Sequence, residues 1–213
     1  MSAFEDKVEL VWVTPNAERL ITKMARVSNP SNEDNMETAP RLLRYLIKHR
    51  HWSPFELANM CVKINTERDI SAQILRHRSF TFQEYSSRYS KMQMAELPSF
   101  RRQDLENRQN SIDDLPDNLL DELQDKVAVQ LASTYNVYQE LLDKGVAKEC
   151  ARRILPLCSP TTLYMNGTLR SWIHYIGLRE SNGTQVEHSE IALAIKDLFY
   201  KEFPIISEAL WKS

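Results

Sequence analysis

Three arginine side chains fall within fifteen residues, 76–90, beside one histidine, one carboxylate and seven hydroxyl groups. Each guanidinium presents a planar fork of donors that pairs with two oxygens of a phosphate or a carboxylate. Only Phe80 and Phe82 are purely hydrophobic, and unpaired guanidinium groups are costly to bury, so the segment is not expected to join the core. The composition therefore predicts a binding surface for an oxyanion that carries a polar head.

The scarcity of glycine excludes the usual glycine-rich loops that bind phosphate through backbone N–H groups. The chain has four glycines in 213 residues, and they stand alone at 145, 167, 177 and 183. Neither a dinucleotide fingerprint nor a phosphate-cradling loop can be drawn from them. A formal net charge of −2 also excludes a global positive field of the kind that attracts nucleic acid or anionic lipid. We therefore expect a small anionic ligand that is held by side chains.

The same segment resembles the signature of the flavin-dependent thymidylate synthases. That signature is Arg-His-Arg, seven further residues, a serine, and an arginine two positions later; here it is matched by 76–78, Ser86 and Arg88. Gln73 before it and Glu84 inside it strengthen the match. The stretch His-Trp-Ser-Pro-Phe-Glu at 51–56 resembles another motif of the family, and the likeness runs discontinuously from about residue 25 to about residue 200.

The resemblance implies an activity. Members of this family convert dUMP to dTMP with 5,10-methylenetetrahydrofolate as carbon donor, NADPH as reductant and FAD as cofactor. They use no cysteine nucleophile, so the pyrimidine must be activated electrostatically. The resemblance assigns this role to Arg179, with His51 and Ser86 as further catalytic candidates. Ser86 has no assured general base nearby, which favours a binding role over a nucleophilic one.

The ligand sets follow from the same resemblance. The dUMP site is expected at Gln73, Ile74, Leu75, Arg76, Glu84, Tyr85, Ser86, Ser87, Arg88, Arg152 and Arg179. The FAD site is expected at Ser28, Ser53, Glu56, Arg76, His77, Arg78, Glu84, Thr168, Arg170 and His174. Thr168 stands where the family often has asparagine, so an amide contact would become a hydroxyl contact. Family members are homotetramers whose active sites combine several subunits, and the isolated protomer is expected to be inactive.

Two other chemistries compete for residues of this chain. His49 and His51 could ligate a metal, but no third ligand has a recognisable spacing, so no metal is expected. Cys158 could be a nucleophile, yet nothing near it in the sequence would stabilise a thiolate. The three cysteines are odd in number and lack paired metal-ligand spacing, which indicates a reducing, cytoplasmic compartment.

Two alternative functions remain open. A related enzyme could use the same flavin and dUMP sites but deliver a hydroxymethyl group, and the sequence does not separate the two. A non-catalytic module could instead bind RNA or another anion through the arginines of 76–90. The net charge and the absence of further interleaved basic stretches argue against that module, so no nucleic-acid partner is expected.

The elements that must position these residues are a few strands and many helices. β-Branched and alternating residues predict strands at 7–14 and 58–65. Helical patterns predict helices at 16–26, 38–49, 67–78, 114–145, 148–154, within 161–179, and from 184 to an end at Pro204. Residues 92–115 are expected to form an irregular excursion. The mixture predicts one α+β domain over 1–213 with a small mixed or antiparallel sheet, without a signal peptide or a membrane span.

Overall fold

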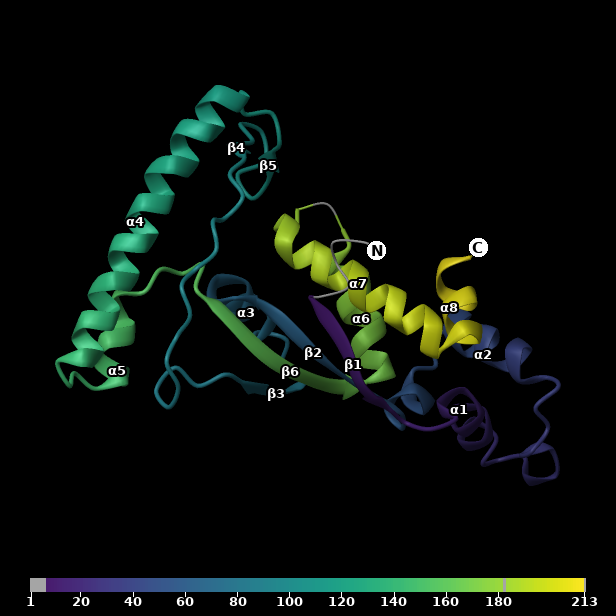
Figure 1. The fold of residues 1–213 in the computed structure, drawn as a ribbon. Helices are drawn as coiled ribbons and strands as arrows, with labels where there is room; N and C mark the ends of the chain where they lie inside the picture. The colour runs from purple at the N-terminus through teal and green to yellow at the C-terminus, as the bar shows by residue number, and fades with distance from the viewer. Residues whose placement is uncertain (1–6, 182, 213) are drawn as a thin grey trace.

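A four-stranded sheet lies at the centre of the fold (Figure 1). The computed structural model describes residues 7–181 and 183–212. The strands are, in spatial order, β1 (Val8–Val13), β2 (Asn59–Glu67), β6 (Pro160–Thr168) and β3 (Thr81–Glu84). All three neighbouring pairs are antiparallel. The predicted α+β class with an antiparallel sheet is therefore confirmed.

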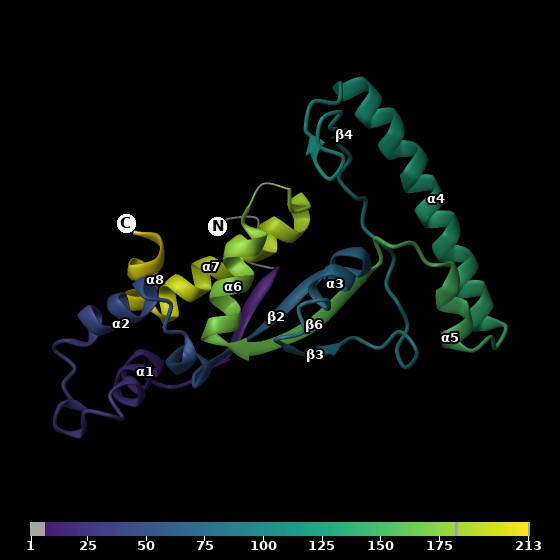
Figure 2. The same ribbon diagram turned by 180° about the vertical axis from the view of Figure 1, so that it is seen from behind.

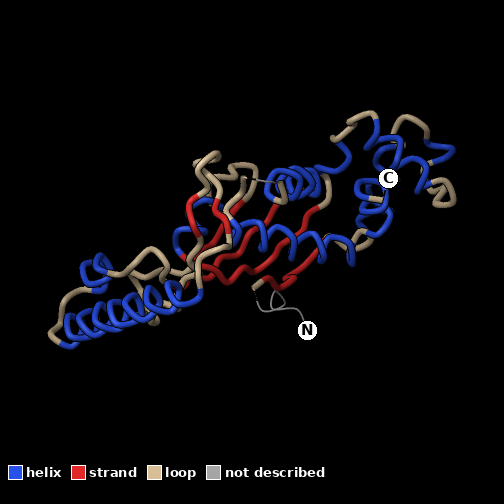
Figure 3. The backbone as a smooth tube through the Cα atoms, turned by 90° about the horizontal axis from the view of Figure 1, so that it is seen from above, coloured by secondary structure: helices blue, strands red, loops and turns tan. Residues whose placement is uncertain are grey.

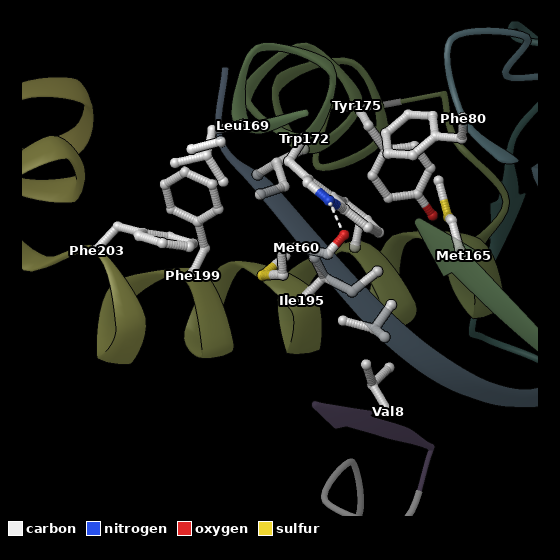
Figure 4. Close-up of a cluster of buried hydrophobic side chains, with 14 of the residues drawn as sticks. Val8, Met60, Phe80, Met165, Leu169, Trp172, Tyr175, Ile195, Phe199 and Phe203 are labelled. Atoms are coloured by element: carbon white, nitrogen blue, oxygen red, sulfur yellow. Dashed lines mark hydrogen bonds between the residues drawn. The ribbon is translucent and has the colours of Figure 1, made fainter. Parts of the chain in front are cut away.

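One face of the sheet carries the main hydrophobic core. Along β6 the side chains alternate, so that Leu163 and Met165 are fully buried while Tyr164 is exposed. The core face is covered by α3 (Arg68–Ile74), α6 (Leu169–Arg179) and α7 (Val186–Glu202) (Figure 1). Trp172 of α6 is fully buried, and its Nε1 donates to the backbone oxygen of Met60 over 2.9 Å (Figure 4). This bond fixes α6 against β2 and so sets the direction of the polar side chains that α6 carries.

A helical layer at one end of the sheet brings helices from the first quarter of the chain against the last helix. It contains α1 (Ala17–Ala25), α2 (Ala39–Lys48) and α8 (Pro204–Trp211), with the 3-10 helices η1 (Pro30–Asn32) and η2 (Ser53–Glu56) nearby (Figure 2). Pro204 follows the end of α7, as predicted, but it also occupies the first turn of α8. Proline has no N–H to lose in a first turn, so one residue stops a helix and starts the next.

An arm stands away from the sheet (Figures 1 and 3). It consists of α4 (Asp117–Asp143), α5 (Lys148–Ala151) and η3 (Arg152–Ile154), preceded by β4 (Arg102–Gln103) and β5 (Ser111–Ile112). The predicted apolar face of α4 is fully buried only at Tyr138, which packs with Met92 and Ala151 in a cluster separate from the main core. Residues 92–115 are irregular, as predicted, apart from β4 and β5. No described helix, α4 included, is both long and apolar enough to cross a membrane.

The helix predicted within 161–179 is confirmed as α6, which follows strand β6 directly. One other predicted helix is wrong in extent. The predicted helix 67–78 ends at Ile74, and β2 extends to Glu67. Residues 75–80 form turns, in which the backbone N–H of His77 donates to Ile74. The sequence pattern predicts that Gln73 and His77 lie on one continuous helical face. The structure does not show this, because the helix ends at Ile74.

The segment 76–90 contains a core residue, so the expectation that it stays out of the core is wrong at one position. Phe80 is only 7% exposed and meets Trp172 edge-on, with ring centroids 4.6 Å apart. A Cβ atom added at Gly167 would lie 2.4 Å from Phe80, so the close approach requires glycine there. One phenyl ring thus anchors the segment to the core, while its arginines stay near the surface.

Candidate active site

Arg179, at the end of α6, lies against His77 in the turn after α3. The Nε of Arg179 donates a hydrogen bond to the Nε2 of His77 over 2.9 Å. Nε2 accepts this bond only when the imidazole is neutral and carries its proton on Nδ1. The His77 ring also meets the ring of Tyr175 edge-on, with centroids 4.8 Å apart. The bond occupies Nε of Arg179, so the two terminal nitrogens remain able to donate to an oxygen of a ligand.

His188 lies deeper, fully buried on α7. Its Nδ1 is 3.2 Å from the Oε1 of Gln73, and its Nε2 is 3.1 Å from the hydroxyl of Tyr175. Gln73 in turn donates from Nε2 to the Oε1 of Gln185 over 2.7 Å. These contacts join three helices at what we call the histidine–arginine cluster: Gln73, His77, Tyr175, Arg179 and His188.

Both imidazoles of this cluster are held neutral. Burial, together with the charge of Arg179 and the nearness of His174, lowers the pKa of His77 to about 4. Burial, together with Arg179 and His77, lowers the pKa of His188 to about 3. Burial also raises the pKa of the Tyr175 hydroxyl. At neutral pH, Arg179 is therefore the one charged member of the cluster, and its charge is not offset by a carboxylate within the cluster.

Two further arginines meet where the arm contacts the loop after β3. Arg88 donates from Nε and Nη2 to the Oε2 of Glu149, at 3.1 and 2.8 Å. Arg152 donates from Nη1 to the hydroxyl of Ser87 at 2.8 Å. Ser87 and Arg88 are adjacent, and Glu149 and Arg152 are one helical turn apart, so both guanidinium groups lie at one place. This arginine junction (Ser87, Arg88, Glu149 and Arg152) carries donors suited to a phosphate group.

The carboxylate of Glu84 is held by its own chain. Its Oε1 accepts hydrogen bonds from the hydroxyls of Ser71 and Thr161, at 2.7 and 3.0 Å, and from Nη1 of Arg68 at 3.2 Å. Three donors on one oxygen fix the orientation of the carboxylate. None of these three bonds uses Oε2.

A cavity of about 750 Å³ opens beside α6. Its walls include the apolar side chain of Trp52 and the polar side chains of Glu56, Arg170 and His174. Arg170 and Glu56 form an ion pair there. At the start of the same helix, the hydroxyl of Thr168 accepts from the backbone N–H of Ser171 and caps the helix. The structure thus brings together three residues that the resemblance assigns to FAD.

A second cavity, of about 460 Å³, lies between α1 and α2 and includes Ser28 in its lining. Its wall is organised by Arg26, which is 7% exposed and donates to the backbone oxygen of Asn35 and to the hydroxyl of Thr38. Tyr45 lines the same cavity, and its ring centroid is 5.9 Å from that of His51. Ser28 and His51 are therefore linked to this second cavity.

The chain matches a family model described as Thymidylate synthase complementing protein over residues 9–205. The probable flavin-dependent thymidylate synthase of Paramecium bursaria Chlorella virus 1 is 52% identical over 195 residues, which cover 91% of this chain and 90% of the relative. The flavin-dependent thymidylate synthase of Synechocystis sp. is 48% identical over 193 residues, which cover 91% and 89%. The chain belongs to the flavin-dependent thymidylate synthase family.

A solved structure agrees in fold with this membership. The UMP/dUMP methylase PolB from Streptomyces cacaoi, bound with 5-Br dUMP, matches with a TM-score of 0.83 at 26% identity, covering 95% of this chain and 93% of that one. The same enzyme bound with 5-Br UMP also gives a TM-score of 0.83. The resemblance to the flavin-dependent thymidylate synthases that the sequence motifs indicate is therefore confirmed.

The structure places nine of the predicted site residues in three groups. Figures 1 and 3 show α5, which lies next to the arginine junction, well apart from α6, which carries Arg179. A single chain therefore does not bring the junction to the histidine–arginine cluster. The groups are Gln73, His77 and Arg179; Ser87, Arg88 and Arg152; and Glu56, Arg170 and His174.

The other predicted site residues described next belong to none of these groups. Ile74 is fully buried in the core, so only its backbone could contact a ligand. Leu75 is 38% exposed, and the hydroxyl of Tyr85 donates to the backbone oxygen of Lys91 over 2.5 Å. Four others are exposed at the surface: Ser53, Arg76, Arg78 and Ser86.

Several residues of the site were not predicted from the sequence. Tyr175 could have been found by helical spacing, because it lies four residues before Arg179 on the same side of α6. His188 had no such signal, since its contact with Gln73 joins residues 115 positions apart. The other residues missed are Arg68, Ser71 and Thr161 around Glu84, and Gln185 beside Gln73.

Proposed function

We propose that the protein transfers a one-carbon unit from 5,10-methylenetetrahydrofolate to C5 of dUMP, with FAD as cofactor, NADPH as reductant and dTMP as product. Its membership of the flavin-dependent thymidylate synthase family supports the reaction type. The observation that carries the proposal is the contact of Arg179 with a neutral His77, in a cluster without a thiol. Methylation at C5 needs negative charge to develop on the pyrimidine, and a fixed guanidinium stabilises that charge.

The cysteines support this electrostatic route over a covalent one. Burial raises the pKa of the Cys61 thiol, and burial with the charge of Glu67 raises that of Cys158. A raised pKa leaves little thiolate at neutral pH, and the thiolate is the nucleophilic form. Cys150 is exposed on α5, in the arm, away from α6 (Figure 1). Within one chain, none of the three thiols belongs to the histidine–arginine cluster around Arg179.

The residues beside α6 fit a flavin dinucleotide. Trp52 provides an apolar wall, while Arg170 and His174 provide donors for oxygen atoms. Arg170 is held by Glu56, and it would exchange that carboxylate for a diphosphate oxygen, which accepts the same planar fork. Side chains thus replace the glycine loop that the sequence lacks. Bound FAD would supply the redox chemistry, because the electrons that reduce the transferred carbon come from NADPH through the cofactor.

The arginine junction would hold the phosphate of dUMP. Ser87 orients Arg152, and Glu149 orients Arg88, before any ligand arrives. A phosphate placed there would receive charge-assisted hydrogen bonds from both guanidinium groups. The remaining proposed dUMP contacts are Gln73, Arg76, Oε2 of Glu84 and Ser86.

A homotetramer would reunite the two halves of the site. We propose that residues 1–213 act as one domain and that copies of the chain complete one another's active sites. The separation of α5, next to the arginine junction, from α6, which carries Arg179, supports this assembly (Figure 1). The partly exposed apolar stripe of α4 (Leu123, Val127 and Leu131) is a surface through which copies would meet.

The absorption spectrum of the purified protein tests the proposal. A protein that holds FAD should be yellow, lose its visible absorbance when NADPH is added without air, and regain it in air. A protein that takes up no FAD would contradict the proposal. Colourless protein that binds RNA with a steep salt dependence would instead indicate the non-catalytic module.

A further inference from the structure

A chain of hydrogen bonds runs from Gln185, just before α7, to Tyr175 on α6. Two residues after Gln185 lies Glu187, whose Oε1 accepts from Nη2 of Arg101 over 2.5 Å. The two side chains are only 15% and 23% exposed. Burial alone would raise the pKa of Glu187, but the hydrogen bond and charge of Arg101 outweigh it and hold that pKa below its usual range. Glu187 is therefore ionised, and an ionised carboxylate can only accept hydrogen bonds.

The side chain of Gln185 also contributes to the low pKa of Glu187. Its Oε1 accepts a hydrogen bond from Nε2 of Gln73 over 2.7 Å, and this bond is the first link of the chain. Because one end of each amide is a donor and the other an acceptor, the orientation of Gln185 fixes the orientation of Gln73.

The same logic continues into the buried histidine. The Oε1 of Gln73 faces Nδ1 of His188 at 3.2 Å, so Nδ1 must carry the proton. Nε2 of His188 then has a free lone pair, and it accepts from the hydroxyl of Tyr175 at 3.1 Å. With Gln73 donating to Gln185, each donor along the chain meets an acceptor. Reversing any single link would place two donors or two acceptors face to face.

We propose that Tyr175, His188 and Gln185 are positioning residues that lock the side-chain amide of Gln73 in one orientation, with its second N–H presented to a carbonyl oxygen of the pyrimidine. The inference rests on the proposed function, because it takes the pyrimidine nucleotide as the ligand. A carbonyl fits better than the phosphate, since Gln73 belongs to the cluster of Arg179 and the arginine junction lies elsewhere in the chain.

The tautomer of His188 tests the direction of the chain without any ligand. Protein labelled with ¹⁵N in its histidines, compared with His188→Asn for assignment, reports which ring nitrogen carries the proton. At neutral pH we expect a neutral ring protonated on Nδ1. A ring protonated on Nε2, or one that is charged, would overturn the proposal. This measurement holds whether or not the protein proves to bind dUMP, so it fails independently of the proposed function.

A double-mutant cycle tests whether these residues act through Gln73. In FAD-loaded protein, Tyr175→Phe and His188→Phe should each weaken dUMP binding roughly three- to tenfold, the usual range for one hydrogen bond. In a Gln73→Ala background, the same substitutions should have little further effect, because the residue they orient is gone. Equal weakening in both backgrounds would show a general structural effect and overturn the proposal.

Two further variants sharpen the cycle. His188→Asn keeps an amide group near the position of Nδ1, so it should retain more dUMP affinity than His188→Phe. Tyr200→Phe is the matched control for Tyr175→Phe, since Tyr200 also lies on a helix against an aromatic ring, that of Trp211 at 5.2 Å, but outside the hydrogen-bond chain. Tyr200→Phe should leave the affinity unchanged. A control that weakens binding as much as Tyr175→Phe would count against the proposal.

Discussion

The Nε of Arg179 and the Nε2 of His77 are 2.9 Å apart, in a hydrogen bond that joins the end of α6 to the turn after α3. The neutral imidazole acts as the acceptor, so it orients the guanidinium without cancelling its charge. A carboxylate at the same place would have neutralised Arg179. The bond therefore combines a fixed direction with a full positive charge, which is what stabilisation of a developing anion requires.

Arg179→Ala should lose most turnover while it still binds FAD. The proposed role of Arg179 is to stabilise charge in the transition state, and removing one such donor typically costs about 10²–10³ in kcat. The variant should keep its flavin absorbance, because the cavity beside α6 is lined by other residues. Steady-state kinetics with the flavin content measured in parallel gives the answer. Full activity in Arg179→Ala would remove the assigned role.

The free energy of unfolding should fall as the pH is lowered from about 6.5 towards 4. The folded-state pKa values of His77 and His188 are about 4 and about 3, below the ordinary value of 6.5. In this window the unfolded chain binds protons that the folded chain does not, so acid favours unfolding; above about 6.5 the contribution is fully present. Urea denaturation at a series of pH values measures the slope.

The variant His188→Phe should flatten this pH dependence, because it removes one of the two groups. The matched control is His49→Phe, since His49 is exposed at the end of α2. The slope should stay unchanged in the control. An equal slope in His188→Phe and in the unaltered protein would show that His188 is not held neutral by the fold.

Ser87→Ala should raise the KM for dUMP roughly three- to tenfold, the range expected for one lost hydrogen bond, with little change in kcat. Ser87 orients Arg152 through a bond of 2.8 Å, and the phosphate that Arg152 would bind is unchanged during the reaction. Ser90→Ala, in the same loop, serves as the control and should behave like the unaltered protein. A fall in kcat with constant KM would place Ser87 in the chemical step instead.

Val127→Asp should lower the molecular mass of the assembly measured by light scattering, and activity should fall with it. Val127 belongs to the partly exposed apolar stripe of α4, and a charge buried between copies would be costly. Val129→Asp is the matched control, because Val129 is 72% exposed and lies on the opposite side of the helix. A tetramer that persists in Val127→Asp would exclude this stripe as the interface.

The sequence was sufficient to predict the family, and to propose residues for the site, because the relevant residues stand in short, rigidly spaced motifs. Arg76, Ser86 and Arg88 are specified by local spacing, and Gln73 and Glu84 lie close to them in the chain. The long helix α4 could also be predicted, because its apolar residues repeat with a helical period over many turns. Strand β3 was missed because its four residues, Thr81–Glu84, lie in a polar segment with no alternating pattern.

What the sequence could not supply are contacts between distant segments. Arg68 and Thr161 converge on Glu84 only because β2, β6 and α3 meet at that edge of the sheet. His188 resembles an ordinary helix residue until α7 packs against α6 and buries it. The neutrality of His77 likewise follows from burial beside Arg179, which no local pattern encodes.

Mass analysis of the product made by a chain without cysteine tests the central claim most directly. Cys61→Ala, Cys150→Ala and Cys158→Ala would be combined in one chain, which is then supplied with dUMP, 5,10-methylenetetrahydrofolate, NADPH and FAD. We predict that this chain forms dTMP at a rate close to that of the unaltered protein. A hydroxymethylated nucleotide from either protein would contradict the assigned product. Loss of dTMP formation in a variant that remains folded and yellow would show that a thiol, and not the guanidinium of Arg179, activates the pyrimidine.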